Sequence, residues 1–193
     1  MGWADFGSNE ETRKEYLARV KYERLVMKSV KSFHGIVASE LEENVQYRFV
    51  TTMAFNAITV LEYLRQNYTL IEVYVVVFRM NNRSFDFLSE IIKDNNLEVG
   101  ILVSNFFLSN SRYERWANEL MSLASTQDNV RTRFLLNHAK LFLGKTKCGK
   151  HIVFEGSGNL SDNSRIEQYI YEKNKTAYEF HKQWINELLD EAK

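Results

Sequence analysis

Short runs of β-branched and aromatic residues alternate with amphipathic segments along most of this chain. The clearest run, residues 70–78, is almost continuously apolar, which is typical of a strand buried on both faces of a sheet. A second buried strand is expected over 97–103, and helices are expected over 56–66, 85–93 and 112–125. This order predicts an α/β sandwich with a mixed, mostly parallel sheet flanked by helices and with antiparallel hairpins near its end.

Further elements complete this prediction at both ends of the chain. Strands are expected over 46–52, 130–136, 138–143, 151–155 and 166–171, and an amphipathic helix over 176–191. The first segment, from Asn9 to Glu43, is expected to form one long helix, because apolar residues recur in it at helical spacing. The simplest division is an N-terminal helical segment, residues 1–44, followed by one α/β domain, residues 45–193.

Two short motifs bring reactive side chains close together. In the first, His138 and Lys140 are two residues apart, so on a strand their side chains share one face. The second is Gly156-Ser157-Gly158-Asn159, in which a hydroxyl and a carboxamide have the same spacing. Residues 144–150 predict a hairpin that places both pairs at one edge of the sheet. Together these groups can attack a phosphodiester and hold its charged oxygens.

The order H-x-K followed by G-S-x-N resembles the phospholipase D superfamily, whose phosphodiesterases work through a histidine and need no metal. The resemblance covers about residues 45–193 and implies the phospholipase D fold. It also implies a set of site residues. The catalytic residues would be His138, Lys140, Ser157, Asn159 and Glu167, and the substrate-binding residues Lys140, Gly156, Gly158 and Asn159.

Two features of the match are less regular. Glu167 falls near the place where many members of the superfamily have an acid that orients the histidine, and Glu172 is close by. Many members also carry Asp five residues after the motif lysine, whereas this chain has Lys145 there. Some active branches, such as the tyrosyl-DNA phosphodiesterases, lack that Asp as well.

The chemistry of the superfamily needs two histidines. One attacks phosphorus and becomes a phosphohistidine, and the second protonates the leaving oxygen and then activates water. His34, His151 and His181 do not belong to a second H-x-K motif. The resemblance therefore implies a homodimer in which two copies of His138 meet at a two-fold axis and share one composite site. No metal or other cofactor is expected.

Local charge favours nucleic acid as the substrate. The 25 basic and 25 acidic residues cancel over the whole chain, but residues 129–154 contain no Asp or Glu. The basic residues of this window are Arg131, Arg133, Lys140, Lys145, Lys147 and Lys150. A positive patch around the site is expected to attract an anionic polymer. The leading hypothesis is a metal-independent nuclease that cleaves DNA or RNA.

Two alternatives stay open. Lys145 in place of the usual Asp suits an inactive protein that uses the same scaffold to bind nucleic acid or another protein. Hydrolysis of a phospholipid is the weaker alternative, because no segment combines Lys with exposed aromatics in the way that membrane-surface helices do.

Other features indicate a cytoplasmic protein without membrane contact. A single cysteine, Cys148, excludes an intrachain disulfide and a cysteine-based zinc site. No apolar run approaches the roughly 20 residues of a membrane span. The polar, charged stretch before Tyr16 is unlike a signal peptide.

Overall fold

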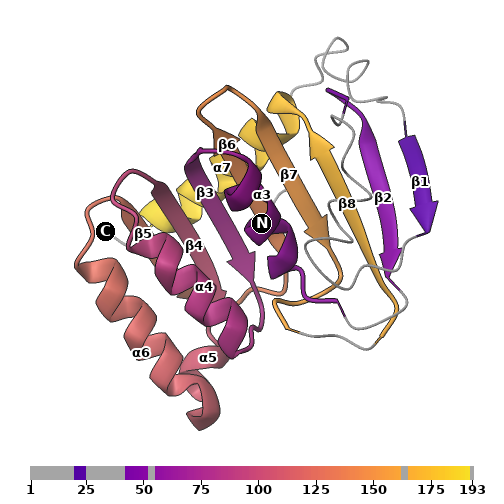
Figure 1. Cartoon of the computed structure of the whole chain (residues 1–193). Helices are drawn as coiled ribbons and strands as arrows, with labels where there is room; N and C mark the ends of the chain where they lie inside the picture. Colours follow the sequence, from indigo (N-terminus) through magenta and orange to yellow (C-terminus); the bar gives the residue numbers. More distant parts are fainter. Residues whose placement is uncertain (1–19, 25–41, 52–54, 162–164, 192–193) are drawn as a thin grey trace, which may run out of the picture.

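The computed structural model describes residues 20–24, 42–51, 55–161 and 165–191, which form one eight-stranded sheet with helices on both faces (Figure 1). The strands are β1 (Val20–Arg24), β2 (Gln46–Thr51), β3 (Leu70–Val77), β4 (Glu98–Ser104), β5 (Val130–Leu135), β6 (Leu141–Thr146), β7 (His151–Gly156) and β8 (Glu167–Lys173). The helices are α3 (Ile58–Asn67), α4 (Asn82–Ile92), α5 (Phe106–Ser109), α6 (Ser111–Ser125) and α7 (Lys175–Asp190). The strand order is β1-β2-β8-β7-β6-β3-β4-β5.

The connections between strands decide how they pair. β3, β4 and β5 are parallel because helices cross between them, and β1 is parallel to β2. β6, β7 and β8 follow one another without a described helix between them and pair antiparallel, as do β6 with β3 and β8 with β2. The sheet is mixed, as predicted. The expectation that it is mostly parallel is wrong, since four of the seven pairs formed by the described strands are antiparallel.

The segment before β2 differs from the single helix expected from Asn9 to Glu43. Residues of β1 lie within this range and pair with β2 from Val20 opposite Gln46 onward. Glu43 forms an isolated bridge with Lys173. The helix is therefore not confirmed, and residues 1–19 and 25–41 lie outside the described residues. An extended segment can form hydrogen bonds with the unpaired backbone groups of β2. The helical periodicity of the segment itself does not reflect this contact with another strand.

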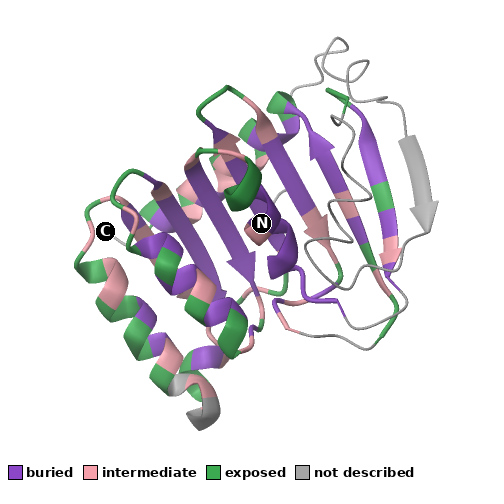
Figure 2. Ribbon diagram, viewed as in Figure 1, coloured by how far each residue is buried: buried purple, intermediate pink, exposed green. Residues whose placement is uncertain are grey.

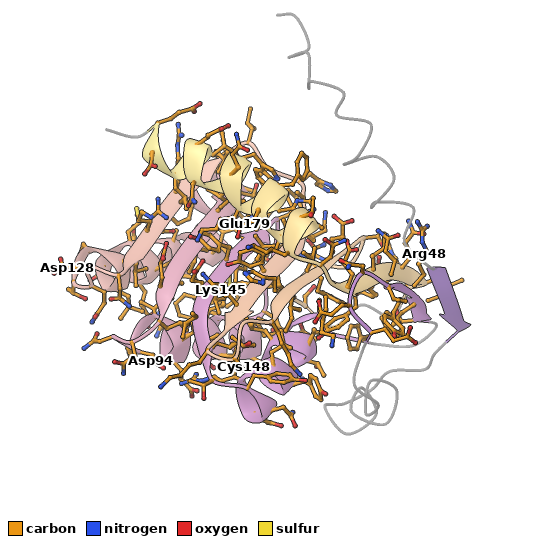
Figure 3. All side chains as sticks on the ribbon, turned by 90° about the horizontal axis from the view of Figure 1, so that it is seen from above. Arg48, Asp94, Asp128, Lys145, Cys148 and Glu179 are labelled. Carbon is orange, nitrogen blue, oxygen red and sulfur yellow. The ribbon has the colours of Figure 1, made fainter. Side chains whose placement is uncertain are left out.

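Apolar side chains cover both faces of the sheet. Val73, Val75 and Val77 of β3 belong to the core beneath α3, α4 and α6, whereas Tyr74 and Val76 belong to the core beneath α7. Figure 3 shows α7 on one face and the other helices on the opposite face. Figure 2 shows the central strands buried along most of their length. Burial on both faces explains why successive residues of β3 are apolar.

Candidate active site

Both motifs lie on loops at one edge of the sheet. This edge is where β3, β4, β5 and β7 end and where β6 and β8 begin. The pairing shows it, because Leu141 at the start of β6 lies opposite Val76 and Glu155, and Gly156 at the end of β7 lies opposite Tyr169. We refer to it as the motif edge. The hairpin brings the two motifs together here, and the Gly156 amide donates to the Lys140 carbonyl at 3.2 Å. His138 and Lys140 precede β6 and do not lie within a strand, which corrects the expected strand start at 138.

The loop that carries His138 is fastened to β3. Asn137 donates from its side-chain amide to the Val77 carbonyl at 3.1 Å and accepts from the Ala139 amide at 2.8 Å. The His138 ring packs on the Phe78 ring, with 4.5 Å between the ring centroids. These contacts leave the imidazole exposed at the motif edge, with Nε2 bound to none of the residues described.

The Lys140 ammonium lies directly beside His138. Its Nζ atom is 3.0 Å from Nδ1 of the imidazole and donates to the His138 carbonyl at 2.5 Å. Burial lowers the pKa of Lys140 below its ordinary value, and the nearby Glu167 carboxylate acts in the opposite direction. A cation held against the imidazole is placed to attract an oxygen of any phosphate that His138 could reach.

Glu167 reaches the motif edge but contacts Ser157 instead of the histidine. The Ser157 hydroxyl donates to the Glu167 carboxylate and accepts from the Gln168 amide at 3.1 Å. The expected bond between Glu167 and His138 is not among the contacts of the described residues. The other candidate acid, Glu172, is buried near the far end of β8 and accepts from Asn174. Of these two candidate acids, Glu167 is therefore the one at this edge, and its direct contact positions Ser157.

Gly156 and Gly158 let the second motif approach the Tyr169 ring closely. A Cβ atom on Gly156 would lie 2.4 Å from the ring, and one on Gly158 would lie 1.8 Å from the Tyr169 hydroxyl. The ring has little room to move, because it stacks on Phe154 and meets Phe55 edge-on. Any larger residue at these positions has to displace the loop that carries Ser157.

We expect Gly158→Ala to destabilise the protein by about 1–3 kcal/mol, because the added methyl group overlaps Tyr169. Gly144→Ala is the matched control, since its Cβ would meet only side-chain carbons at 3.5 and 3.6 Å. Tyr169→Phe should restore part of the stability by removing the closest atom. Denaturant unfolding measures all three, and a Gly158→Ala protein as stable as Gly144→Ala would contradict the packing.

Asn159 follows the close-packed glycine and is partly buried. Its side-chain oxygen and the Tyr169 hydroxyl are buried and have no hydrogen-bond partner among the residues described. The next residue, Leu160, forms a bridge with Met80 just beyond β3. The structure thus brings Asn159 to the same edge as His138, Lys140 and Ser157.

A hollow of about 570 Å³ opens beside Lys140 on the face covered by α7. Its lining includes Lys140, Glu155 and Gly156 from the hairpin, and His181 and Trp184 from α7. Nδ1 of His181 accepts from the Trp184 indole at 3.2 Å, and Nε2 of His181 is 3.8 Å from the Glu155 carboxylate. Burial lowers the pKa of His181 and raises that of Glu155, so both neutral forms are favoured. These residues were not identified from the sequence, because the helical pattern of α7 does not indicate that this helix packs beside the hairpin.

Lys145, which stands where many superfamily members have Asp, is part of a partly buried ion cluster around Glu72. Its ammonium donates to Glu72 at 2.6 Å, and the same carboxylate accepts from Tyr178 at 2.9 Å and from Lys182. Figure 3 shows Lys145 near the middle of the sheet on the side of α7, which carries the labelled Glu179. Lys145 is therefore a partly buried structural cation near the hairpin turn, at the end of β6 away from the motif edge.

The basic window does not gather around the site as expected. Ion pairs join Arg131 to Glu98 and Asp190, Arg133 to Glu191, and Lys145 to Glu72. Lys147 and Lys150 lie near the hairpin turn at the opposite edge of the sheet. Of this window, Lys140 alone lies at the motif edge, so the expected positive patch around the site is wrong. Acids from β3, β4 and the C-terminal region pair with three of its six basic residues.

Two other features are absent from the described ranges. No group of three or more His, Cys, Asp or Glu side chains there could hold a metal ion. None of the helices seen in this part of the chain is long and apolar enough to cross a membrane.

Comparison with known proteins shows what the fold resembles. No family model and no curated protein matches the chain. The chain is similar to polyphosphate kinase from Porphyromonas gingivalis, with a TM-score of 0.54 and 14% identity over 75% of this chain and 26% of that one. It is similar to the archaeal chromatin protein TrmBL2, whose structure shows a novel mode of DNA binding, with a TM-score of 0.52 and 14% identity over 94% of this chain and 61% of that one.

A third similar structure is the phospholipase D family member Nuc from Salmonella typhimurium. The TM-score is 0.50 and the identity 13%, over 72% of this chain and 93% of Nuc. The chain thus spans about a quarter of the kinase and about three fifths of TrmBL2, but nearly all of Nuc. At these identities the likeness concerns the fold.

Proposed function

The chain has the fold of the phospholipase D superfamily, and from this premise we propose that it is a metal-independent phosphodiesterase that cleaves nucleic acid through His138. One observation carries the proposal: the loops before β6 and after β7 place His138 and Lys140 beside Ser157 and Asn159 at one edge of the sheet. These four residues are the ones that the sequence motifs single out.

In the proposed reaction, the Lys140 ammonium turns from Nδ1 of His138 to the phosphate, and the ring proton moves to Nδ1. The unprotonated Nε2 then forms a bond to phosphorus while the bond from phosphorus to the leaving oxygen breaks. His138 of the partner subunit gives a proton to that oxygen. It then takes a proton from a water molecule, which attacks the phosphohistidine and frees the first imidazole. Lys140 and Asn159 donate to the nonbridging oxygens, where charge develops. Ser157, held by Glu167, fixes the loop and its glycines.

A second subunit is part of this proposal because the chain contains one H-x-K motif. Large apolar side chains exposed at the motif edge support it. Leu136 is 88% exposed on the loop that carries His138, Ile166 is 74% exposed directly before β8, and Leu108 is 47% exposed in α5. They lie on three separate connections, and a two-fold contact that covered them would bring two His138 side chains together.

We expect Leu136→Glu to separate the subunits and to reduce phosphodiester hydrolysis at least tenfold, because a charge would replace the most exposed apolar group of the proposed interface. The side chain is almost fully exposed, so the monomer should fold. Met121→Glu, on α6, is the matched control. Light scattering and activity are measured together. An active Leu136→Glu monomer would show that the composite site is wrong.

Binding of nucleic acid without cleavage is the second candidate function. The fold shared with the DNA-binding protein TrmBL2 supports it, as does the position of Glu167 on Ser157 instead of on His138. Cleavage of single- and double-stranded DNA in EDTA, by the wild type and His138→Ala, separates the two. Cleavage that the variant lacks supports the phosphodiesterase, whereas binding without cleavage by either protein supports the second candidate.

A further inference from the structure

A second hollow, of about 800 Å³, lies beside the motif edge on the face of the sheet opposite α7. We propose that it is a groove for single-stranded nucleic acid that leads the strand toward His138. The claim that the bound strand leads toward His138 rests on the proposed function, whereas binding in the groove does not require cleavage. The lining residues used in the argument are Arg79, Arg83, Arg115, Tyr113 and Trp116.

The groove is continuous with the candidate active site. Phe78, whose ring supports His138, directly precedes Arg79 in the chain. On the other side, Leu160 directly follows Asn159 and is fastened to the same segment: its amide donates to the Arg79 carbonyl at 3.0 Å, and its carbonyl accepts from the Asn81 amide at 2.8 Å. The wall of the groove is therefore built from the residues next to both motifs.

The charge of the groove is positive. Arg79 and Arg115 are exposed, and neither guanidinium forms an ion pair with a described residue. Arg83 differs, because its guanidinium binds the Glu62 carboxylate. The lining residues that the structure describes include no Asp or Glu. Two cations that pair with no acid among the described side chains lie next to the motif edge, and they suit successive phosphates of a nucleic acid backbone better than one small anion.

Aromatic rings give the groove a preference for single strands. Tyr113 and Trp116 line it and are only partly buried. Trp116 stacks on Phe85, with 5.7 Å between centroids and 11° between planes, and Tyr113 packs against Trp116 at 5.3 Å. Such rings are fixed in place and can stack on unpaired bases. A duplex keeps its base faces covered, so the strand that fits the groove is single.

The test is binding of a fluorescein-labelled single-stranded DNA of roughly 16 nucleotides. It is measured by anisotropy in EDTA at several salt concentrations, in the His138→Ala background so that the probe stays intact. Arg79→Ala with Arg115→Ala should weaken binding at low salt by about 10- to 100-fold. The slope of log affinity against log salt should fall by about 1.4, or about 0.7 for each phosphate of a single strand that the protein no longer neutralises.

Matched variants keep the result interpretable. Arg79→Lys with Arg115→Lys should retain most of the slope, because the charges stay. Lys93→Ala with Lys175→Ala removes the same charge from the opposite edge of the sheet and should change the affinity by less than about threefold. Circular dichroism checks that each variant is folded.

The outcomes separate this inference from the proposed function. Equal affinity and slope for the arginine-to-alanine pair and the Lys93/Lys175 pair would overturn the groove, as would equal affinity for a duplex of the same sequence. The proposed function would stand in either case if the wild type cleaves DNA. Conversely, groove-dependent binding together with no cleavage by the wild type would uphold the groove and leave the phosphodiesterase proposal wrong.

Discussion

His138→Ala is expected to lower the kcat for phosphodiester hydrolysis in EDTA by at least about 10⁴-fold. The imidazole is the exposed nucleophile in the proposed reaction, and in a composite dimer its replacement removes both the attacking nitrogen and the acid for the leaving oxygen. A simple diester such as bis(4-nitrophenyl) phosphate reports this directly, because it needs no groove.

A second histidine variant serves as the control. His151 begins β7 at the opposite edge, where its ring meets Tyr178 edge-on at 5.1 Å. His151→Ala should keep activity within a few-fold of the wild type. If His138→Ala stays active while folded and dimeric, the assignment of His138 as the nucleophile is wrong.

Glu72→Ala is expected to destabilise the protein by about 3–5 kcal/mol, because it leaves Lys145 and Lys182 beside the core without their shared acceptor. The Glu72 side chain is 10% exposed and joins β3 to β6 and α7. A destabilisation of this size lowers the Tm by roughly 10 °C in a chain of this length. Glu90→Ala is the matched control, since Glu90 pairs with Arg65 at 3.8 Å on the surface, and it should cost less than about 1 kcal/mol.

The same cluster predicts how stability depends on pH. Burial would raise the pKa of Glu72, but hydrogen bonds from Lys145, Lys182 and Tyr178 outweigh it and leave the pKa below its ordinary value. A pKa that is lower in the folded state means that the ionised carboxylate stabilises the protein above its unfolded pKa of about 4.3. That stabilisation is lost as the pH falls through the folded pKa.

Glu72→Gln isolates this contribution. The difference in unfolding free energy between wild type and Glu72→Gln should be constant near neutral pH and should shrink as the pH falls below about 4.3. Denaturant titrations between neutral and acidic pH measure it. A difference that grows toward acid pH would contradict the depressed pKa.

Local pattern was enough to predict most elements of the domain. The apolar run from residue 70 predicted β3. A strand buried on both faces lacks the usual alternation of apolar and polar residues. The hairpin before His151 brought the two motifs to one edge, since strands joined by a tight turn must pair antiparallel. The resemblance to the phospholipase D superfamily rested on these motifs, and the structure confirms the fold that it implied.

Features that depend on contacts between distant segments were not predictable in this way. The expected basic patch does not form, because Arg131 and Arg133 each bind an acid more than 50 residues later in the chain. Arg131 also binds Glu98 in the neighbouring strand. β1 pairs with β2 although its neighbourhood has helical periodicity. The lining of the hollow beside Lys140 required α7 to be placed over the sheet, and no local pattern gives that placement.

The measurement that tests the central claim most directly is capture of the covalent intermediate. Enzyme turning over a diester in EDTA is quenched in base, which preserves phosphohistidine, and its peptides are analysed by mass spectrometry. We predict an adduct on His138 in which phosphorus still carries one ester group of the diester, and this adduct is absent from His138→Ala and from enzyme without substrate. Hydrolysis that requires a divalent metal and leaves His138 unmodified would contradict the proposed mechanism.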